Sequence, residues 1–114
     1  MVRTVERDRV HQVRFEPWKR CTAWLRAFDD GSIQAETFDR DYLHGELERV
    51  DLYDFGPASV QALAVALEVD PGTADAAAKV CDALLAQSGG NWFELMKAVN
   101  EAGADFVHSV DPWP

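Results

Sequence analysis

Nucleophilic catalysis would need a thiol or hydroxyl beside a base, and this sequence offers two thiols and three imidazoles. Cys21 and Cys81 each fall on an apolar face of an expected strand or helix, where a thiol is inert. Nothing in the spacing of His11, His44 and His108 pairs a base with either thiol. We therefore predict that the protein is not an enzyme and has no catalytic residues. The redox state of the two cysteines stays open.

Metal and phosphate chemistry is equally unsupported by the residue pattern. A zinc site needs His, Cys or carboxylate ligands at short spacing, and the three histidines are scattered. Asp29-Asp30-Gly31 lacks the ligand spacing of an EF-hand calcium loop. Gly89-Gly90-Asn91 precedes an expected helix, but without the strand and the basic residue of a phosphate-binding loop. We expect no metal site and no cofactor.

The elements that position these residues begin with strands in the first half of the chain. Apolar residues alternate over 21–28, which predicts a strand with one buried face. A second strand over 33–38 follows Asp30-Gly31, and Asp-Gly between two such runs predicts a hairpin with both residues at positive φ. Residues 10–15 predict a further strand.

Residues 41–55 fit two alternatives. Asp41 would cap a short helix that has Leu43, Leu47 and Val50 on one face. The same residues would also form a strand that runs through Val50. The sequence leaves the choice between helix and strand open.

The second half predicts three helices. Pro57 opens the first, and apolar residues then recur at helical spacing. Thr73 caps the second helix, which ends at Gly89-Gly90. Asn91 caps the third helix in the manner of a capping box, and Gly103 closes it. A short last strand over 106–110 precedes the tail.

Together these elements predict an α+β fold in a single domain, residues 1–114. A small antiparallel β-sheet from the N-terminal half, with its hairpin at about 21–38, packs against a C-terminal bundle of about three helices.

One segment shows a local resemblance. Residues 63–76 are similar to the helix-turn-helix of phage-repressor-type regulators, which often read L-A-x-x-L-G-V-x-P-G-T-V-S-R. The chain keeps Leu63-Ala64 and Pro71-Gly72-Thr73, but Glu68 replaces the turn glycine and Asp75 stands among the positions that face DNA. A recognition helix presents Arg, Lys, Asn or Gln to DNA. The resemblance therefore implies a helix pair of this shape without DNA binding.

Composition and charge exclude several classes of protein. The chain has 114 residues, of which 47% are hydrophobic, so it is neither disordered nor collagen-like. It has no apolar run long enough to span a membrane and no apolar segment of signal-peptide type, so we expect a cytoplasmic protein.

The charge is negative overall and unevenly distributed. Twenty Asp and Glu against eleven Lys and Arg give −9. Residues 1–27 carry a net charge of +4, whereas residues 28–54 carry −7. A negative field repels nucleic-acid phosphates and anionic lipids, and it attracts basic surfaces. We expect no direct contact with nucleic acid or with a membrane.

This charge predicts a non-enzymatic binding protein that inhibits or regulates another protein by occupying a basic surface. Carboxylates spaced along a sheet edge and turn imitate a row of phosphates, so the target would be a nucleic-acid-binding surface. In type, the chain resembles small phage-encoded anti-defence inhibitors, such as anti-CRISPR and antirestriction proteins. The candidate partner-binding residues are nine acids and one tail aromatic: Asp29, Asp30, Glu36, Asp39, Asp41, Glu46, Glu48, Asp51, Asp54 and Trp113.

Two other functions stay open. A structural or accessory subunit would use the helical half, around Trp92, Phe93 and Met96, to form a homodimer or a heteromer. A small enzyme with an unrecognised site is the second alternative. It would depend on a residue such as Cys81 or His44.

Overall fold

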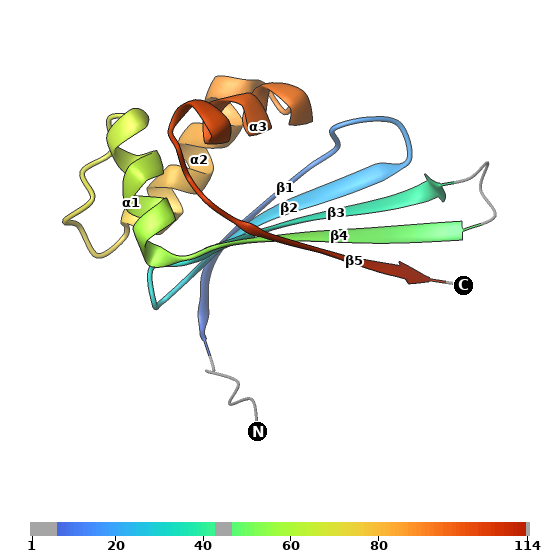
Figure 1. Cartoon of the computed structure of the whole chain (residues 1–114), viewed down its shortest axis with the longest axis horizontal. Coiled ribbons are helices and arrows are strands. Elements are labelled where there is room, and N and C mark those ends of the chain that lie inside the picture. Colours follow the sequence, from blue (N-terminus) through green and yellow to red (C-terminus); the bar gives the residue numbers. More distant parts are fainter. Residues whose placement is uncertain (1–6, 43–46, 114) are drawn as a thin grey trace.

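The computed structural model describes residues 7–42 and 47–113, in which five antiparallel strands form one sheet in the order β1-β2-β3-β4-β5 (Figure 1). The strands are β1 (Arg9–Phe15), β2 (Cys21–Phe28), β3 (Ile33–Tyr42), β4 (Leu47–Phe55) and β5 (Val107–Trp113). Three helices lie between β4 and β5 in the chain: α1 (Pro57–Ala66), α2 (Ala76–Ser88) and α3 (Trp92–Glu101). The α+β fold expected from the sequence is confirmed.

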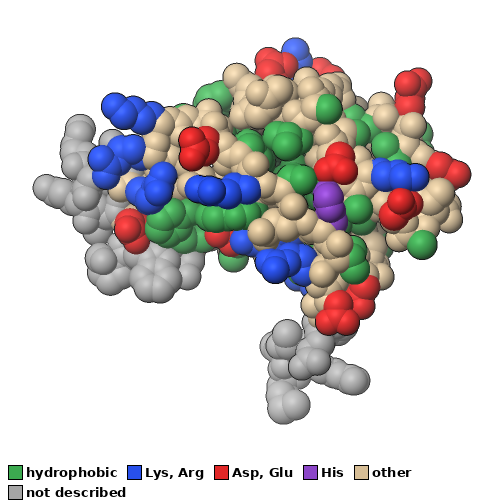
Figure 2. Space-filling model, turned by 180° about the vertical axis from the view of Figure 1, so that it is seen from behind, with side chains coloured by type: hydrophobic (Ala, Val, Ile, Leu, Met, Phe, Trp, Pro, Cys, Tyr) green, Lys and Arg blue, Asp and Glu red, His purple; other side chains and the backbone are tan. Residues whose placement is uncertain are grey.

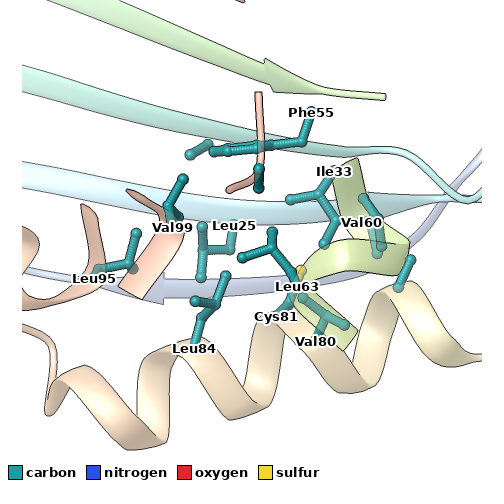
Figure 3. Packing of buried hydrophobic residues seen from close by; sticks show 14 of the residues in the cluster. Leu25, Ile33, Phe55, Val60, Leu63, Val80, Cys81, Leu84, Leu95 and Val99 are labelled. Carbon is teal, nitrogen blue, oxygen red and sulfur yellow. The ribbon is translucent and has the colours of Figure 1, made fainter. Parts of the chain in front are cut away.

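All three helices cover the same face of the sheet. Along β2, the side chains of Ala23, Leu25 and Ala27 are buried on this face, because successive residues of a strand point to opposite sides. Because alanine side chains are small, α2 can pack closely against β1 and β2. Leucine, isoleucine, valine and phenylalanine side chains from three strands and three helices fill the core (Figure 3).

The helices cover only part of the sheet. They lie over the end at which the β2–β3 turn is found, and the strands extend past them at the opposite end (Figure 1). We call these the helix end and the far end of the sheet. The far end holds the loop between β1 and β2.

The two alternatives for residues 41–55 are resolved in favour of a strand. β4 runs from Leu47 to Phe55, and Val50 pairs with Phe38 of β3. Leu43, which the helical alternative required, lies outside the described residues. The last strand is longer than expected, since β5 continues from Val107 to Trp113 and includes much of the tail.

Two local predictions are wrong. Gly31 has φ 85°, but Asp30 is not at positive φ. The turn is closed by two hydrogen bonds, from Gly31 N–H to Phe28 O and from Phe28 N–H to Ser32 O. Such a hairpin needs only one left-handed residue. Thr73 does not cap α2, which begins three residues later with Asp75 at the N-cap position. The Thr73 hydroxyl instead donates a hydrogen bond to Asp70 O at 3.1 Å.

The other helix boundaries follow the sequence signals. Pro57 begins α1, and Gly89, with φ 63°, ends α2. The side chain of Asn91 accepts a hydrogen bond from Glu94 N at 3.1 Å and caps α3. Gly103, with φ 69°, follows the last turn of α3. No helix in the described part of the chain is long and apolar enough to cross a membrane.

The connection between α1 and α2 departs from a helix-turn-helix. It spans residues 67–75, whereas the turn of that motif has about three or four residues. Glu68, which stands at the family's glycine position, has φ 60°. Its N–H bonds to Val65 O, and Val69 N–H bonds to Ala64 O at 2.8 Å, so the helix ends in a Schellman motif.

Candidate partner-binding surface

The structure divides the predicted acidic residues between the two faces and two ends of the sheet. Glu36 lies on the face of the sheet opposite to the helices, which we call the open face, and its carboxylate pairs with Arg26 at 2.9 Å. Asp54, on the same face, accepts a hydrogen bond from Gln34 at 3.1 Å. Asp39 belongs to the far end, where it accepts a hydrogen bond from the Trp18 indole at 3.4 Å. These carboxylates do not form one continuous surface.

Among the predicted acids whose side chains the structure describes, Asp51 is the most enclosed, with 9% of its surface exposed. Arg49 donates to both of its oxygens, and His108 Nε2 lies 2.8 Å from Oδ1. The imidazole of His108 also stacks on the Tyr53 ring, with 4.4 Å between centroids. Because Asp51 lies on β4 and His108 on β5, this cluster joins the last strand to the sheet.

The Asp51–His108 pair could orient an imidazole for proton transfer, but the thiol on the same face of the sheet is unsuitable as its nucleophile. Cys21 is fully buried and free. Burial raises the pKa of its thiol to about 12, so the reactive thiolate is absent at neutral pH. Cys81 is also free and buried, and burial raises its pKa to about 12.

Three predicted residues belong to strand ends near the connection between β3 and β4, and a fourth, Glu46, falls within that connection in the sequence. Asp41 belongs to β3, and Glu48 is exposed on β4. The backbone of Trp113 pairs with Glu48, so the tail aromatic stands on β5 rather than on a free tail. Glu46 lies outside the described residues. Partner binding by these four residues stays a prediction.

The other two predicted acids, Asp29 and Asp30, occupy the β2–β3 turn at the helix end. The turn packs beside the α1–α2 connection, because Asp30 lines one hollow with Pro71 and Asp29 lines another with Asp75. Asp70 precedes Pro71 in the same connection. All four residues are exposed. We call this set, Asp29, Asp30, Asp70 and Asp75, the acidic end. Chain segments forty or more positions apart thus bring carboxylates to one end of the molecule.

A hollow of about 350 Å³ lies between the two halves of the acidic end. Asp29 and Asp75 line it from the β2–β3 turn and from the start of α2. The remaining lining is apolar and comes from β1, β2, the α1–α2 connection and α2: Val10, Phe28, Ala74, Ala77 and Ala78. An apolar hollow with two carboxylates at its rim suits a long cationic side chain, whose stem is apolar and whose tip is charged.

Local hydrogen bonds favour the ionised form of two of these carboxylates, those of Asp30 and Asp75. Partial burial would raise the pKa of Asp30, but the hydroxyl and N–H of Ser32 both donate to its carboxylate and lower the pKa below the ordinary value. For Asp75, slight desolvation is outweighed by the Thr73 hydroxyl and by Lys79, so its pKa is also lowered. Lys79 Nζ lies 3.4 Å from Asp75 Oδ1.

Asp70 and Asp75 were missed by the sequence analysis. Both flank the Pro71-Gly72-Thr73 turn, and Asp70 accepts the hydrogen bond of Gly72 N–H at 2.9 Å, as turn-forming Asp residues commonly do. That signal predicts a turn. Nothing in the sequence brings this turn next to Asp29, because their proximity depends on how α1 and α2 pack on the sheet.

A second hollow, of about 390 Å³, lies between the β1–β2 loop and the start of α3. It is lined by Pro17, Trp18, Asn91, Trp92 and Phe93. Phe93 is 79% exposed and Trp18 is 40% exposed, whereas Trp92 is buried. The hollow therefore has two aromatic side chains at its rim that the protein itself does not cover.

Comparisons with protein-family models, with curated proteins and with solved structures find no match to this chain. Among residues 7–42 and 47–113, no three His, Cys, Asp or Glu side chains are grouped so that they could hold a metal ion. Function must therefore be inferred from the geometry and charge of the chain itself.

Proposed function

We propose that this protein binds a basic surface of another protein through its acidic end, and that it regulates or inhibits that protein by occupying the surface. The hollow between Asp29 and Asp75 carries this proposal. A charged rim over an apolar floor is the arrangement that a partner's Arg or Lys would fill. Lys79 already pairs with Asp75 at 3.4 Å, so a partner's Arg or Lys would share that carboxylate and add positive charge beside Asp29, which a neutral polar side chain would not do.

The energetics favour an arginine as the central contact. A guanidinium between two carboxylates makes charge-assisted hydrogen bonds, which are shorter and stronger than neutral ones. Its aliphatic stem would cover Ala77 and Ala78, and its plane could stack on the Phe28 ring. Arg7 already makes this kind of contact, since its guanidinium carbon lies 4.2 Å from the Phe28 centroid. Arginine is among the residues that most often dominate binding energy at interfaces.

The partner we propose is a nucleic-acid-binding protein. Its basic surface is adapted to a row of phosphates, and the carboxylates of the β2–β3 turn and of the α1–α2 connection can replace those phosphates. An inhibitor of this kind would compete with nucleic acid for one surface. This is the mode of action expected of anti-CRISPR-like or antirestriction-like proteins, which the chain resembles in type.

The test uses tagged protein to capture partners from a lysate of its source cells at about 50 and 500 mM NaCl. The reach of surface charge falls from about 14 Å to about 4 Å over this range. The baits are the wild type, the double variant Asp29→Lys/Asp75→Lys, and a control, Glu101→Lys/Asp105→Lys. The control makes the same change in net charge at two exposed acids after the middle of α3.

We expect the wild type and the control to capture a basic partner at low salt, and the Asp29→Lys/Asp75→Lys variant not to capture it. Added nucleic acid should displace this partner from the wild type. Circular dichroism and thermal melting must show all three baits to be folded. Equal loss with both double variants would mean that only bulk charge matters, and retention by Asp29→Lys/Asp75→Lys would contradict the proposal.

The exposed aromatics around the second hollow favour one other function, an accessory subunit that assembles through the helical half. Of the three residues predicted for this interface, Trp92 is buried and Phe93 is 79% exposed. Analytical ultracentrifugation over a hundredfold range of concentration would test it. Self-association of the wild type that Phe93→Asp abolishes would support assembly, and a constant monomer mass would argue against a homo-oligomer.

A further inference from the structure

The outer edge of the sheet at β1 is open. β1 pairs with β2 on one side, and no other strand in the described part of the chain pairs with it. A strand of seven residues therefore directs a row of backbone N–H and C=O groups outward. Val10, on this strand, is 58% exposed. Such an edge can accept an additional strand from another protein.

This edge is basic in a protein whose net charge is −9. Arg9 and Arg14 lie on β1, and Lys19 and Arg20 follow in the loop to β2; all four are exposed. Seen from the side opposite to Figure 1, several Lys and Arg side chains lie on the part of the molecule toward the far end (Figure 2). The acids nearest in sequence are Asp8 and Glu16, and Glu16 lies 4.0 Å from Arg14. Cations thus outnumber acids along this edge.

We propose that the β1 edge binds an extended acidic segment of a partner protein, which adds a sixth strand to the sheet. Backbone hydrogen bonds would supply affinity, and Arg9, Arg14 and Lys19 would select Asp or Glu on the added strand. The start of β1 borders the acidic end, because Val10 also lines its hollow, whereas Arg14 lies at the other end of the strand and Lys19 in the loop beyond it. The protein would thus have two adjacent binding surfaces of opposite charge.

Charge also favours an acidic peptide over two other candidate ligands of the β1 edge, a second copy of the chain and a nucleic acid. A second copy pairing β1 with β1 would bring the arginines of the two strands together, and like charges on neighbouring strands are destabilising. A nucleic acid would meet the basic edge, but it cannot continue the ladder of backbone hydrogen bonds, and the remaining field of the protein repels it. An acidic peptide satisfies both the charge and the hydrogen-bonding pattern.

The test measures the dissociation constant of a fluorescent seven-residue peptide that alternates Glu with Val, matched in length to β1. One control peptide has Lys in place of Glu. Two others carry N-methyl groups on alternate residues, either the odd or the even set. In an added strand only one set of N–H groups points at β1, so methylation of one set should abolish binding and methylation of the other should not. Simple charge attraction would make both methylated peptides bind equally, which would overturn strand addition.

Protein variants test the basic edge. We expect Arg14→Glu/Lys19→Glu to weaken peptide binding about tenfold or more. The control, Lys79→Glu/Lys97→Glu, changes net charge equally on α2 and α3 and should change affinity less than twofold. If the peptide pairs with β1, its addition should protect β1 amides from hydrogen exchange.

Several results would overturn the proposal: equal weakening by both double variants, no binding of the Glu-Val peptide at millimolar concentration, or tighter binding of a single-stranded oligonucleotide of the same charge. The acidic end is tested separately, because Asp29→Lys/Asp75→Lys should leave the peptide on the β1 edge. Failure of one surface is thereby distinguishable from failure of the other.

Discussion

Asp51 and Asp29 have the same side chain but opposite environments. Asp51 is 9% exposed and is held by Arg49 and His108, so its charge is neutralised within the molecule. Asp29 is exposed and lines the hollow of the acidic end. Glu36 resembles Asp51 in this respect, because Arg26 pairs with it at 2.9 Å. A count of acids along the chain therefore overstates the charge that a partner would meet.

Glu68 adopts a backbone conformation that suits glycine, with φ 60° at the end of α1. For a residue with a Cβ atom this conformation costs about 1–2 kcal/mol, whereas glycine adopts it freely. We expect Glu68→Gly to raise the free energy of unfolding by about 1 kcal/mol, measured by urea denaturation. Glu68→Gln serves as the control, since it removes the charge and keeps the Cβ atom. An equal gain in the control would assign the effect to charge.

The two buried thiols should make the protein sensitive to high pH. Burial raises the pKa of both Cys21 and Cys81 from 9.0 to about 12, so the unfolded chain loses these protons before the folded protein does. Stability should therefore fall as the pH rises above about 9. We expect a smaller fall in the Cys21→Ala/Cys81→Ala variant, measured by urea denaturation between pH 7 and pH 11. Burial also raises the pKa of Tyr53, which remains in the variant and accounts for part of the residual fall.

At the scale of elements, the helices differ in how their ends are capped. α3 has a side-chain cap from Asn91, whereas no side chain caps α1 or α2. α3 also ends in a Schellman motif, in which Ala104 N–H bonds to Val99 O at 3.2 Å. The helix that carries the exposed Phe93 is thus defined at both ends by local hydrogen bonds.

Loss of the α3 cap should be measurable. Asn91→Ala leaves Glu94 N–H without its side-chain acceptor, and we expect a loss of about 1 kcal/mol in the free energy of unfolding. Asn100→Ala, at an exposed position of the same helix, should have a much smaller effect or a slight stabilising one. Similar losses in both variants would indicate that the cap contributes nothing specific.

At the scale of the whole molecule, the basic and acidic parts of the chain are partly paired internally. Arg7 lies 4.0 Å from Asp54, and His11 Nε2 lies 2.8 Å from Asp82. The remaining charges separate, with carboxylates at the acidic end and cations along the β1 edge. This separation gives one small sheet two surfaces that would attract different partners.

Carboxylates gathered at one end repel one another, and salt screens that repulsion. We expect the free energy of unfolding to rise between about 20 and 500 mM NaCl, measured by urea denaturation at pH 7. The rise should be smaller in Asp29→Asn/Asp70→Asn, which reduces the repulsion, than in Glu101→Gln/Asp105→Gln. A decrease in stability with salt would mean that internal pairs such as Arg26–Glu36 outweigh the repulsion.

Local patterns by themselves determined most of the elements. Alternation over 21–28 predicts β2, Pro57 begins α1, and Asn91 caps α3, because each of these signals acts over a few neighbouring residues. Residues 41–55 stayed ambiguous because short apolar runs satisfy both periods. Pairing of Val50 with Phe38 on a neighbouring strand made that segment a strand, and this contact is long-range.

The arrangement of charges was decided only by the tertiary structure. The sequence identified Asp29 and Asp30 as turn acids, but it could not bring Asp75 and the α1–α2 connection beside them, since α1 and α2 must first pack on the sheet. It also counted Asp51 among the available acids, because nothing local predicts that His108 on β5 will pair with it. Spacing along the chain determines local conformation, whereas proximity between distant side chains depends on the packing of the core.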